Sequence, residues 1–126
     1  MVSVAAGWDD PAVPNRVLIV DDHATFRAMA RTVLADAGFE VVGEAADAES
    51  ALAAARNLRP DCVLLDVQLG DADGFEVAEE LARATAVVLT SGRDPEDLQP
   101  LINGSAAKGF IPKEKLSASA LEELLR

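Results

Sequence analysis

Short apolar runs alternate along this chain with longer segments in which apolar residues recur every three or four positions. The first run, RVLIV at 16–20, is continuous and rich in β-branched residues, which is typical of a strand covered on both faces. Helical spacing follows over 23–39, where Gly38 is a helix stop signal. The same pair recurs four more times. The further expected strands are 39–45, 61–67, 86–91 and 109–113, and the further expected helices are 47–58, 74–84, 94–104 and 115–126.

Strands that alternate with helices in this way form a parallel sheet with helices on both faces. We therefore expect one α/β domain over residues 16–126, a doubly wound (βα)5 fold. Asp47 is the expected N-cap of the second helix, and Pro100 is expected to kink or shorten the fourth. Residues 1–15 lack periodicity, and we expect them to form a flexible N-terminal leader.

The composition agrees with a single soluble domain. The chain has 126 residues, half of them hydrophobic, and its net charge of −11 argues against direct binding to nucleic acid. It contains no apolar run of the roughly 20 residues that a membrane helix needs and no secretory signal, so we expect a cytoplasmic protein without a membrane partner. Cys62, the single cysteine, excludes an internal disulfide and is expected to be a buried strand thiol.

Function in doubly wound sheets sits at the carboxyl ends of the strands, so the residues that follow each expected strand are candidate site residues. The second strand ends in Glu44 and small residues. The other four strands end in acidic, hydroxyl or basic side chains, which are, in chain order, Asp21, Asp22, Asp66, Thr90, Ser91 and Lys113. The sequence therefore predicts one polar site at this edge of the sheet.

Carboxylates that converge within a few ångströms raise one another's pKa and destabilise the fold unless a cation offsets their charge. Oxygen ligands suit Mg²⁺, or Mn²⁺, which keeps several waters and leaves positions for a phosphoryl oxygen. Together with such an ion, the Lys113 ammonium and the Thr90 hydroxyl would stabilise a phosphoryl group in transfer. Asp66, alone on the central strand, is the expected nucleophile, because carboxylates form acyl-phosphate intermediates.

Four motifs, each at a strand end, resemble the receiver domains of two-component response regulators. They are VDD after the first strand, LLDVQLGDADGFE around the third, VVLTS at the fourth and GFIPK at the fifth, and the resemblance covers residues 16–126. It implies a flavodoxin-like and CheY-like sheet with strand order 2-1-3-4-5. It also implies a bacterial signalling domain that catalyses its own aspartyl phosphorylation and dephosphorylation rather than a metabolic enzyme.

The resemblance implies a role for each residue that matches the family's acidic site. Asp66 would accept a phosphoryl group from a phosphohistidine of a histidine kinase or phosphotransfer protein. Asp22 would bind Mg²⁺ directly and Asp21 mainly through water. Asp66 and the backbone carbonyl of Gln68 would complete the protein ligands, and Lys113 would pair with the phosphoryl oxygens.

The resemblance also implies a switch. Thr90 would turn toward the phosphoryl group while the ring of Phe110 moves inward, although Phe110 also fits a plain core position. This would change the face made by the fourth helix, the fifth strand and the fifth helix, which would bind a protein partner or a second copy of the chain. Gln68 and Gly92 match positions that tune the lifetime of the phosphoryl group.

The sequence departs from the family pattern at three places, one of which is a short third helix with a short connection. Gly70 stands where the family commonly has proline, four residues after the phosphoacceptor, which favours a more mobile loop. Pro112 precedes Lys113 and Glu114 follows it, whereas the family often has a cis proline after the lysine. His23, next to the acidic pair, is expected to be a surface or site-edge residue rather than a phosphocarrier.

Alternatives remain open at this stage. A stand-alone regulator is favoured because the sequence stops at the fifth helix, and the second hypothesis is the receiver part of a longer DNA-binding transcription factor. A Mg²⁺-dependent phosphohydrolase with an aspartate nucleophile is a remote third, since VDDHA lacks the usual two-residue spacing of its acids. A flavin binder would need a hydroxyl-rich and glycine-rich loop after the first strand, which is absent.

Overall fold

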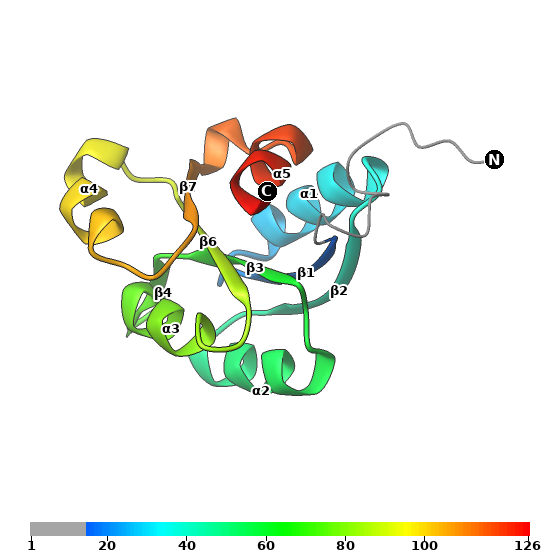
Figure 1. Cartoon of the computed structure of the whole chain (residues 1–126), viewed down its shortest axis with the longest axis horizontal. Coiled ribbons are helices and arrows are strands. Elements are labelled where there is room, and N and C mark those ends of the chain that lie inside the picture. The colour runs from blue at the N-terminus through cyan, green and yellow to red at the C-terminus, as the bar shows by residue number, and fades with distance from the viewer. Residues whose placement is uncertain (1–14) are drawn as a thin grey trace.

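Five parallel strands form the central sheet of the computed structural model, which describes residues 15–126 (Figure 1). The strands are β1 (Arg16–Val20), β2 (Glu40–Ala45), β3 (Cys62–Asp66), β6 (Ala86–Ser91) and β7 (Gly109–Pro112). They lie in the order β2-β1-β3-β6-β7, which is the predicted order 2-1-3-4-5. The predicted leader lies outside the described residues, apart from Asn15.

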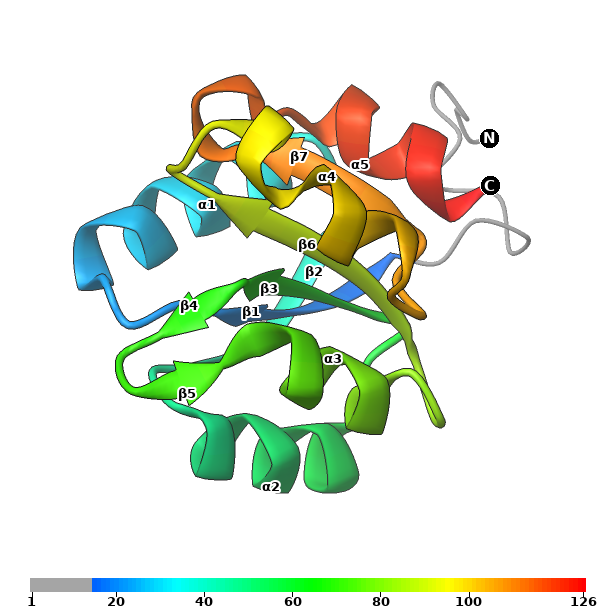
Figure 2. The ribbon, with the colours of Figure 1, turned by 90° about the vertical axis from the view of Figure 1, so that its left-hand side faces the viewer.

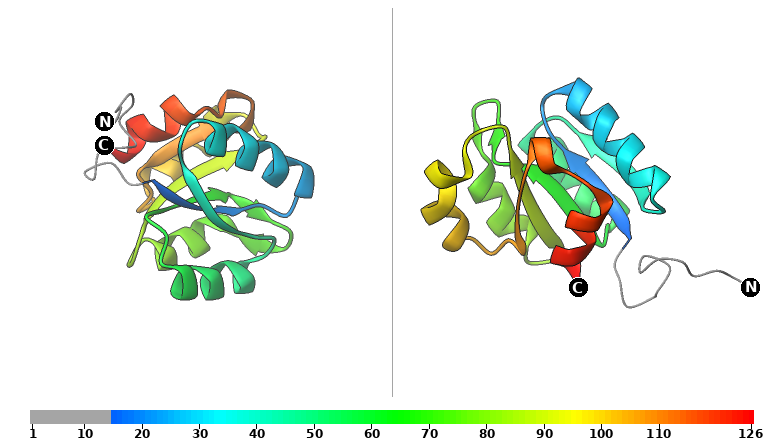
Figure 3. Two further views of the ribbon diagram at one scale, coloured as in Figure 1. Left: turned by 90° about the vertical axis from the view of Figure 1, so that its right-hand side faces the viewer. Right: turned by 90° about the horizontal axis from the view of Figure 1, so that it is seen from above.

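Helices cover both faces of this sheet (Figures 2 and 3). Two of them, α1 and α5, lie on one face, and α2, α3 and α4 lie on the other. Their bounds are α1 (Ala24–Asp36), α2 (Ala48–Leu58), α3 (Gly74–Leu81), α4 (Pro95–Asn103) and α5 (Ala118–Leu125). The structure therefore confirms the predicted doubly wound α/β fold.

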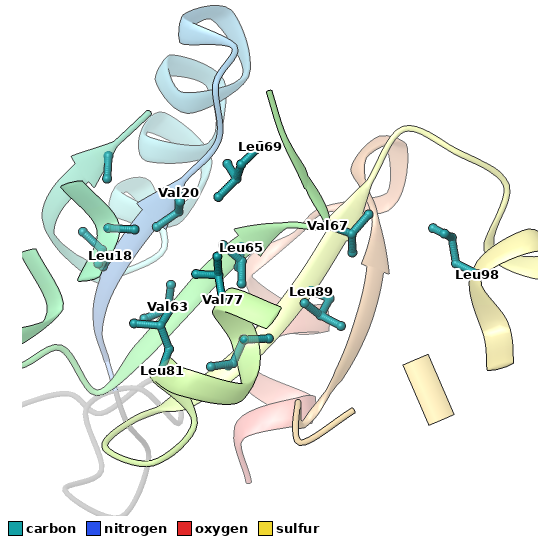
Figure 4. Close-up of a cluster of buried hydrophobic side chains, with 14 residues drawn as sticks. Leu18, Val20, Val63, Leu65, Val67, Leu69, Val77, Leu81, Leu89 and Leu98 are labelled. Atoms are coloured by element: carbon teal, nitrogen blue, oxygen red, sulfur yellow. The ribbon is translucent and has the colours of Figure 1, made fainter. Parts of the chain in front are cut away.

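Side chains of the central strands alternate between two apolar clusters, one on each face of the sheet. Val63 and Leu65 of β3 pack with Leu81 of α3 in one cluster, which Figure 4 shows. Leu64 packs with Leu34 of α1 in the other. The side chains of Val63, Leu64, Leu65 and Leu34 are fully buried, at 0% exposure. Burial on both faces explains why the strands read as continuous apolar runs.

Cys62 is fully buried in β3, as predicted for a strand thiol. Burial, with a smaller contribution from the charge of Asp61, raises the pKa of its thiol to about 12. The thiol is therefore protonated and unreactive at neutral pH. Among the described residues, no helix is both long enough and apolar enough to cross a bilayer.

Helix ends follow local capping. The Asp47 side chain accepts a hydrogen bond from Ser50 N, which confirms it as the N-cap of α2. The last helix starts three residues later than predicted, because Ser117 caps it by accepting from Ala120 N and residues 113–115 form a 3₁₀ turn. The third helix ends at Leu81, three residues earlier than predicted. The fourth is short, at nine residues, with Pro100 inside it.

A short hairpin that the sequence analysis missed joins β3 to α3. Its antiparallel strands are β4 (Gln68–Leu69) and β5 (Ala72–Asp73). Gly70 is the first residue of the two-residue loop and has a φ of +56°. Two-residue hairpin loops need a positive φ at this position, and glycine adopts it readily. The signal was the sequence QLGDAD, whose strands are too short to show periodicity.

Close packing fixes where the hairpin meets α3. Gly74, the first residue of α3, donates its N–H to the carbonyl oxygen of Val67 at 2.9 Å. A Cβ at position 74 would lie 2.5 Å from the Asp66 carbonyl oxygen and from backbone atoms of Val67. Only glycine allows the helix to start this close to the end of β3.

Candidate functional site

The carboxyl ends of the strands bring the predicted site residues to one edge of the sheet. Asp21 directly follows β1, and Lys113 directly follows β7. Asp66 is the last residue of β3 and lies opposite Thr90 of β6 in the parallel register. Ser91, which follows Thr90, is buried at the same edge. Residues separated by up to about ninety positions in the sequence therefore meet because parallel strands end together.

The acidic side chains of this edge form one cluster. One potential ligand atom from each of Asp21, Asp22, His23 and Asp66 lies within 4.8 Å of the others. Asp21 is fully buried and Asp66 is 3% exposed, whereas the side chain of Asp22 is one-third exposed, at 33%. Two carboxylates are thus held away from water beside a third that solvent reaches.

The pKa of Asp66 is raised above its usual value. Burial is the largest cause, and the negative charge of Asp21 adds to it. Two contacts oppose these effects: Gln68 N donates to Asp66 Oδ1 at 3.1 Å, and the Lys113 ammonium lies near the other oxygen. The Asp66 carboxylate is therefore poorly solvated but keeps a backbone donor and a cation beside it.

Lys113 is the cation that offsets this buried charge. Its Nζ lies 2.7 Å from Asp21 Oδ2 and 3.4 Å from Asp66 Oδ2. It also lies 4.6 Å from the centroid of the Phe26 ring, within the range of a cation–π interaction. Burial lowers the pKa of Lys113, but the contacts with Asp21 and Asp66 outweigh it and raise the pKa overall. Lys113 therefore stays protonated at neutral pH.

The missed hairpin forms one wall of the site. Gly70 N donates to Asp22 Oδ2 at 3.1 Å, and this contact joins the loop of the hairpin to the most exposed carboxylate. The open space in front of the cluster is a cavity of about 400 Å³. Its lining residues are Asp22, His23, Asp66, Gln68, Gly70, Ser91, Gly92, Arg93 and Lys113.

Two further residues, one expected at the site edge and one that sequence reasoning missed, contact the acidic cluster or its backbone. His23 Nδ1 lies 3.0 Å from Asp21 Oδ1 and 3.0 Å from Asp22 Oδ1, so His23 is at the edge of the site, as expected. Arg27 Nη1 donates to the Asp21 carbonyl oxygen at 2.7 Å, and its Nε donates to Glu44. The spacing of Arg27, one helical turn after His23, was the available signal.

Thr90 is fully buried, and its hydroxyl has no hydrogen-bond partner within residues 15–126. Buried hydroxyls are normally paired, so an unpaired one beside Asp66 is a donor left free for another group. Phe110 of β7 lies opposite Leu89 of β6. Its half-buried side chain packs against the apolar cluster that contains Leu98 of α4. All peptide bonds of the described residues are trans, including those around Pro112.

An acidic site with a lysine and a free hydroxyl, at the carboxyl edge of a five-stranded doubly wound sheet, defines a flavodoxin-like domain of the receiver class. A family model described as the response regulator receiver domain matches residues 17–126. The chain therefore belongs to the receiver domain family of two-component response regulators.

Named relatives agree with this assignment. The chain is 35% identical to the transcriptional regulatory protein PdtaR of Mycobacterium tuberculosis, over 91% of this chain and 62% of PdtaR. It is 43% identical to protein-glutamate methylesterase/protein-glutamine glutaminase 2 of Anaeromyxobacter dehalogenans, over 73% of this chain and 27% of that protein. The chemotaxis response regulator CheY4 of Vibrio cholerae superposes with a TM-score of 0.73 at 30% identity, covering 89% of this chain and 99% of CheY4. The chain thus spans less than two-thirds of the first two relatives.

Proposed function

We propose that Asp66 accepts a phosphoryl group from a phosphohistidine of a histidine kinase or phosphotransfer protein. One observation carries this proposal: Asp66 ends the central strand, poorly solvated, with the Lys113 ammonium 3.4 Å from its Oδ2 and a cavity in front of it. Membership of the receiver family supports it, because receiver domains act with such partners.

The transfer is a displacement at phosphorus. A carboxylate oxygen of Asp66 forms a bond to phosphorus while the bond from phosphorus to the donor's imidazole nitrogen breaks. That nitrogen leaves with the bonding electron pair. Because the other ring nitrogen of the phosphohistidine carries a proton, the products are an acyl phosphate and a neutral imidazole. The phosphoryl oxygens become more negative during the transfer, and Lys113 holds a positive charge beside them. The unpaired hydroxyl of Thr90 donates a hydrogen bond to one of these oxygens.

Mg²⁺, or Mn²⁺, is the proposed cofactor. The donor set fits, because the carboxylates of Asp21, Asp22 and Asp66 lie together and the two buried ones share the single positive charge of Lys113. Asp22 would bind the ion directly, Asp21 mainly through water, and Asp66 and the Gln68 carbonyl would complete the ligands. When bound, the ion supplies positive charge to the phosphoryl oxygens.

The proposed output is a change in the face formed by α4, β7 and α5. Movement of the Thr90 hydroxyl toward the phosphoryl group leaves space at the end of β6, and the half-buried ring of Phe110 is placed to respond. Leu101 of α4 is 55% exposed and offers an apolar contact on this side of the sheet. The face would bind a downstream protein or a second copy of the chain. Gln68 and Gly92, which line the cavity, would tune the phosphoryl lifetime.

The decisive experiment measures intact mass after incubation with a small phosphodonor and Mg²⁺. We expect the native chain to gain one base-labile phosphoryl group, and we expect none for Asp66→Asn or for native protein with chelator. Asp71→Asn is the matched control, because Asp71 is an exposed acid of the same loop. A phosphoryl gain by Asp66→Asn equal to that of the native chain would refute Asp66 as the acceptor.

A further inference from the structure

A second groove lies at the opposite edge of the sheet from the acidic site, between the C-terminal ends of α2 and α3. It has a volume of about 540 Å³. Its floor is apolar and is formed by Leu52, Ala55, Pro60 and Leu81. The residues that lead into β3 and β6 form this edge, so the groove shares no lining residue with the proposed phosphoryl site.

Three exposed arginines surround this apolar floor: Arg56, Arg59 and Arg83. None of their guanidinium groups forms a hydrogen bond or ion pair with any residue from 15 to 126. Glu80 is the one acidic residue of the lining, so the groove carries a net positive charge in a chain whose net charge is −11. An apolar floor with unpaired guanidinium groups at its rim suits an aromatic side chain beside carboxylates.

The start of the described chain is fixed at the rim of this groove. Arg16 Nη1 donates to the carbonyl oxygen of Arg59 at 2.7 Å, and Arg16 Nη2 donates to that of Leu58 at 3.0 Å. The backbone N–H groups of Asn15 and Arg16 both donate to Asp61 Oδ2, at 3.3 and 3.0 Å. The described chain therefore starts beside Arg59 and Pro60, which line the groove.

We propose that the segment Trp8–Asp10 of the same chain binds in this groove. The indole of Trp8 covers the apolar floor, and the carboxylates of Asp9 and Asp10 pair with the guanidinium groups. Six residues lie between Trp8 and Asn15, and the seven residue steps from Asn15 to Trp8 reach up to about 25 Å when extended, so Trp8 can reach a groove whose lining includes Arg59 and Pro60.

The chain's own segment is the favoured occupant for two reasons. Its attachment beside the groove gives it a high effective concentration there, which an acidic segment of another protein lacks. Its two carboxylates are repelled by the strongly negative rest of the domain, whereas the three arginines attract them. Sequence alone favoured a flexible leader, because the groove exists only after α2 and α3 are placed side by side. This inference is independent of the proposed phosphoryl transfer.

The single tryptophan of the chain provides the test. In the full chain we expect Trp8 fluorescence to be shifted to shorter wavelength and to be quenched by acrylamide several-fold less than in urea-unfolded protein. Arg56→Gln/Arg83→Gln is expected to move both properties toward those of the unfolded chain. Lys108→Gln/Lys115→Gln is the matched control, since it removes the same number of exposed positive charges outside the groove and should leave the fluorescence unchanged.

A second variant tests the acidic side chains that are proposed to pair with the arginines. Asp9→Asn/Asp10→Asn changes only the leader, so it is expected to expose Trp8 without any effect on the far-ultraviolet circular dichroism of the domain. Native Trp8 that is quenched as in unfolded protein overturns the proposal. So does a protected Trp8 that neither variant exposes, because the indole would then pack elsewhere. If the protection of Trp8 from acrylamide disappears on dilution, the groove binds the leader of a second copy instead. That result would also overturn the proposal.

Discussion

Lys113 lies closer to Asp21 than to Asp66, with Nζ 2.7 Å from Asp21 Oδ2. Asp21 is fully buried, so this lysine is its principal compensating charge in the structure. Removing one partner of a buried ion pair is far more costly than losing an exposed pair, because the other charge stays buried and uncompensated. Lys113 therefore stabilises the fold as well as completing the proposed phosphoryl site.

We expect Lys113→Met to lower the free energy of unfolding in the absence of Mg²⁺ by about 3 kcal/mol, measured by urea denaturation. Lys115→Met, which removes an exposed lysine two residues away, should change it by less than about 0.5 kcal/mol. Adding Asp21→Asn to Lys113→Met should restore much of the loss. Equal stability of the Lys113 and Lys115 variants would show that Asp21 does not depend on this lysine.

Asp22 is expected to control the response of stability to Mg²⁺. When an ion binds only the folded state and its free concentration is about 100 times its Kd, it stabilises that state by about 2.7 kcal/mol. Mg²⁺ should therefore raise the Tm of the native chain. Asp22→Asn keeps an oxygen to accept from Gly70 N and reduces the repulsion within the acidic cluster. Without Mg²⁺ it should therefore be at least as stable as the native chain.

Thermal unfolding with and without Mg²⁺ measures this difference. The Tm of Asp22→Asn should be nearly insensitive to Mg²⁺, whereas Asp71→Asn should respond as the native chain does. A full Mg²⁺ shift in Asp22→Asn would remove Asp22 from the proposed ligand set without bearing on Asp66 as the phosphoacceptor.

Gly74 and Gly92 form a matched pair of glycine positions near the site. A Cβ at position 74 would meet backbone atoms of Asp66 and Val67 at 2.5 Å, whereas a Cβ at position 92 has no neighbour within 4 Å. We expect Gly74→Ala to lower the free energy of unfolding by about 1–3 kcal/mol, because rigid backbone must move. Gly92→Ala should change it by less than about 0.5 kcal/mol. Urea denaturation of both variants compares them, and equal stabilities would count against the close approach of α3 to β3.

Glu44, at the end of β2, is paired with two arginines of α1. Arg31 Nε donates to it at 2.7 Å and Arg27 Nε at 3.0 Å. The hydrogen bond from Arg31 is the largest influence on the pKa of Glu44; burial opposes it, and Arg27 adds to it, so the pKa lies below its ordinary value. A carboxyl with a lowered pKa stabilises the fold above its unfolded pKa and loses this contribution as pH falls through the folded pKa.

We therefore expect Glu44→Gln to be less stable than the native chain by up to about 1 kcal/mol at pH 7, since the pair is partly exposed. The difference should shrink as pH falls below about 4.3, the ordinary pKa of glutamate. Glu123→Gln, at an exposed position of α5, is the control and should show no such pH-dependent loss. A deficit for Glu44→Gln that persists unchanged at acid pH would mean that packing, rather than charge, is its cause.

The sequence by itself determined the order of strands and helices and the residues at each strand end. Runs such as RVLIV and CVLLD are continuous because both faces of β1 and β3 are covered, so their apolar pattern is visible without the partners. Asp66, Thr90 and Lys113 could be assembled in advance because parallel strands end at one edge. The identity of the family followed from the motifs at those ends.

Only the tertiary structure decided which of these charges touch. The preference of Lys113 for Asp21, the contact of Gly70 with Asp22, and the position of Phe26 beside the lysine each join elements that are distant in sequence. The hairpin at β4 and β5 was missed because two-residue strands have no periodicity, and the arginine-rimmed groove exists only where α2 meets α3. Sequence patterns record which surface of each element is buried. The distances between side chains of different elements depend on packing, which local patterns do not encode.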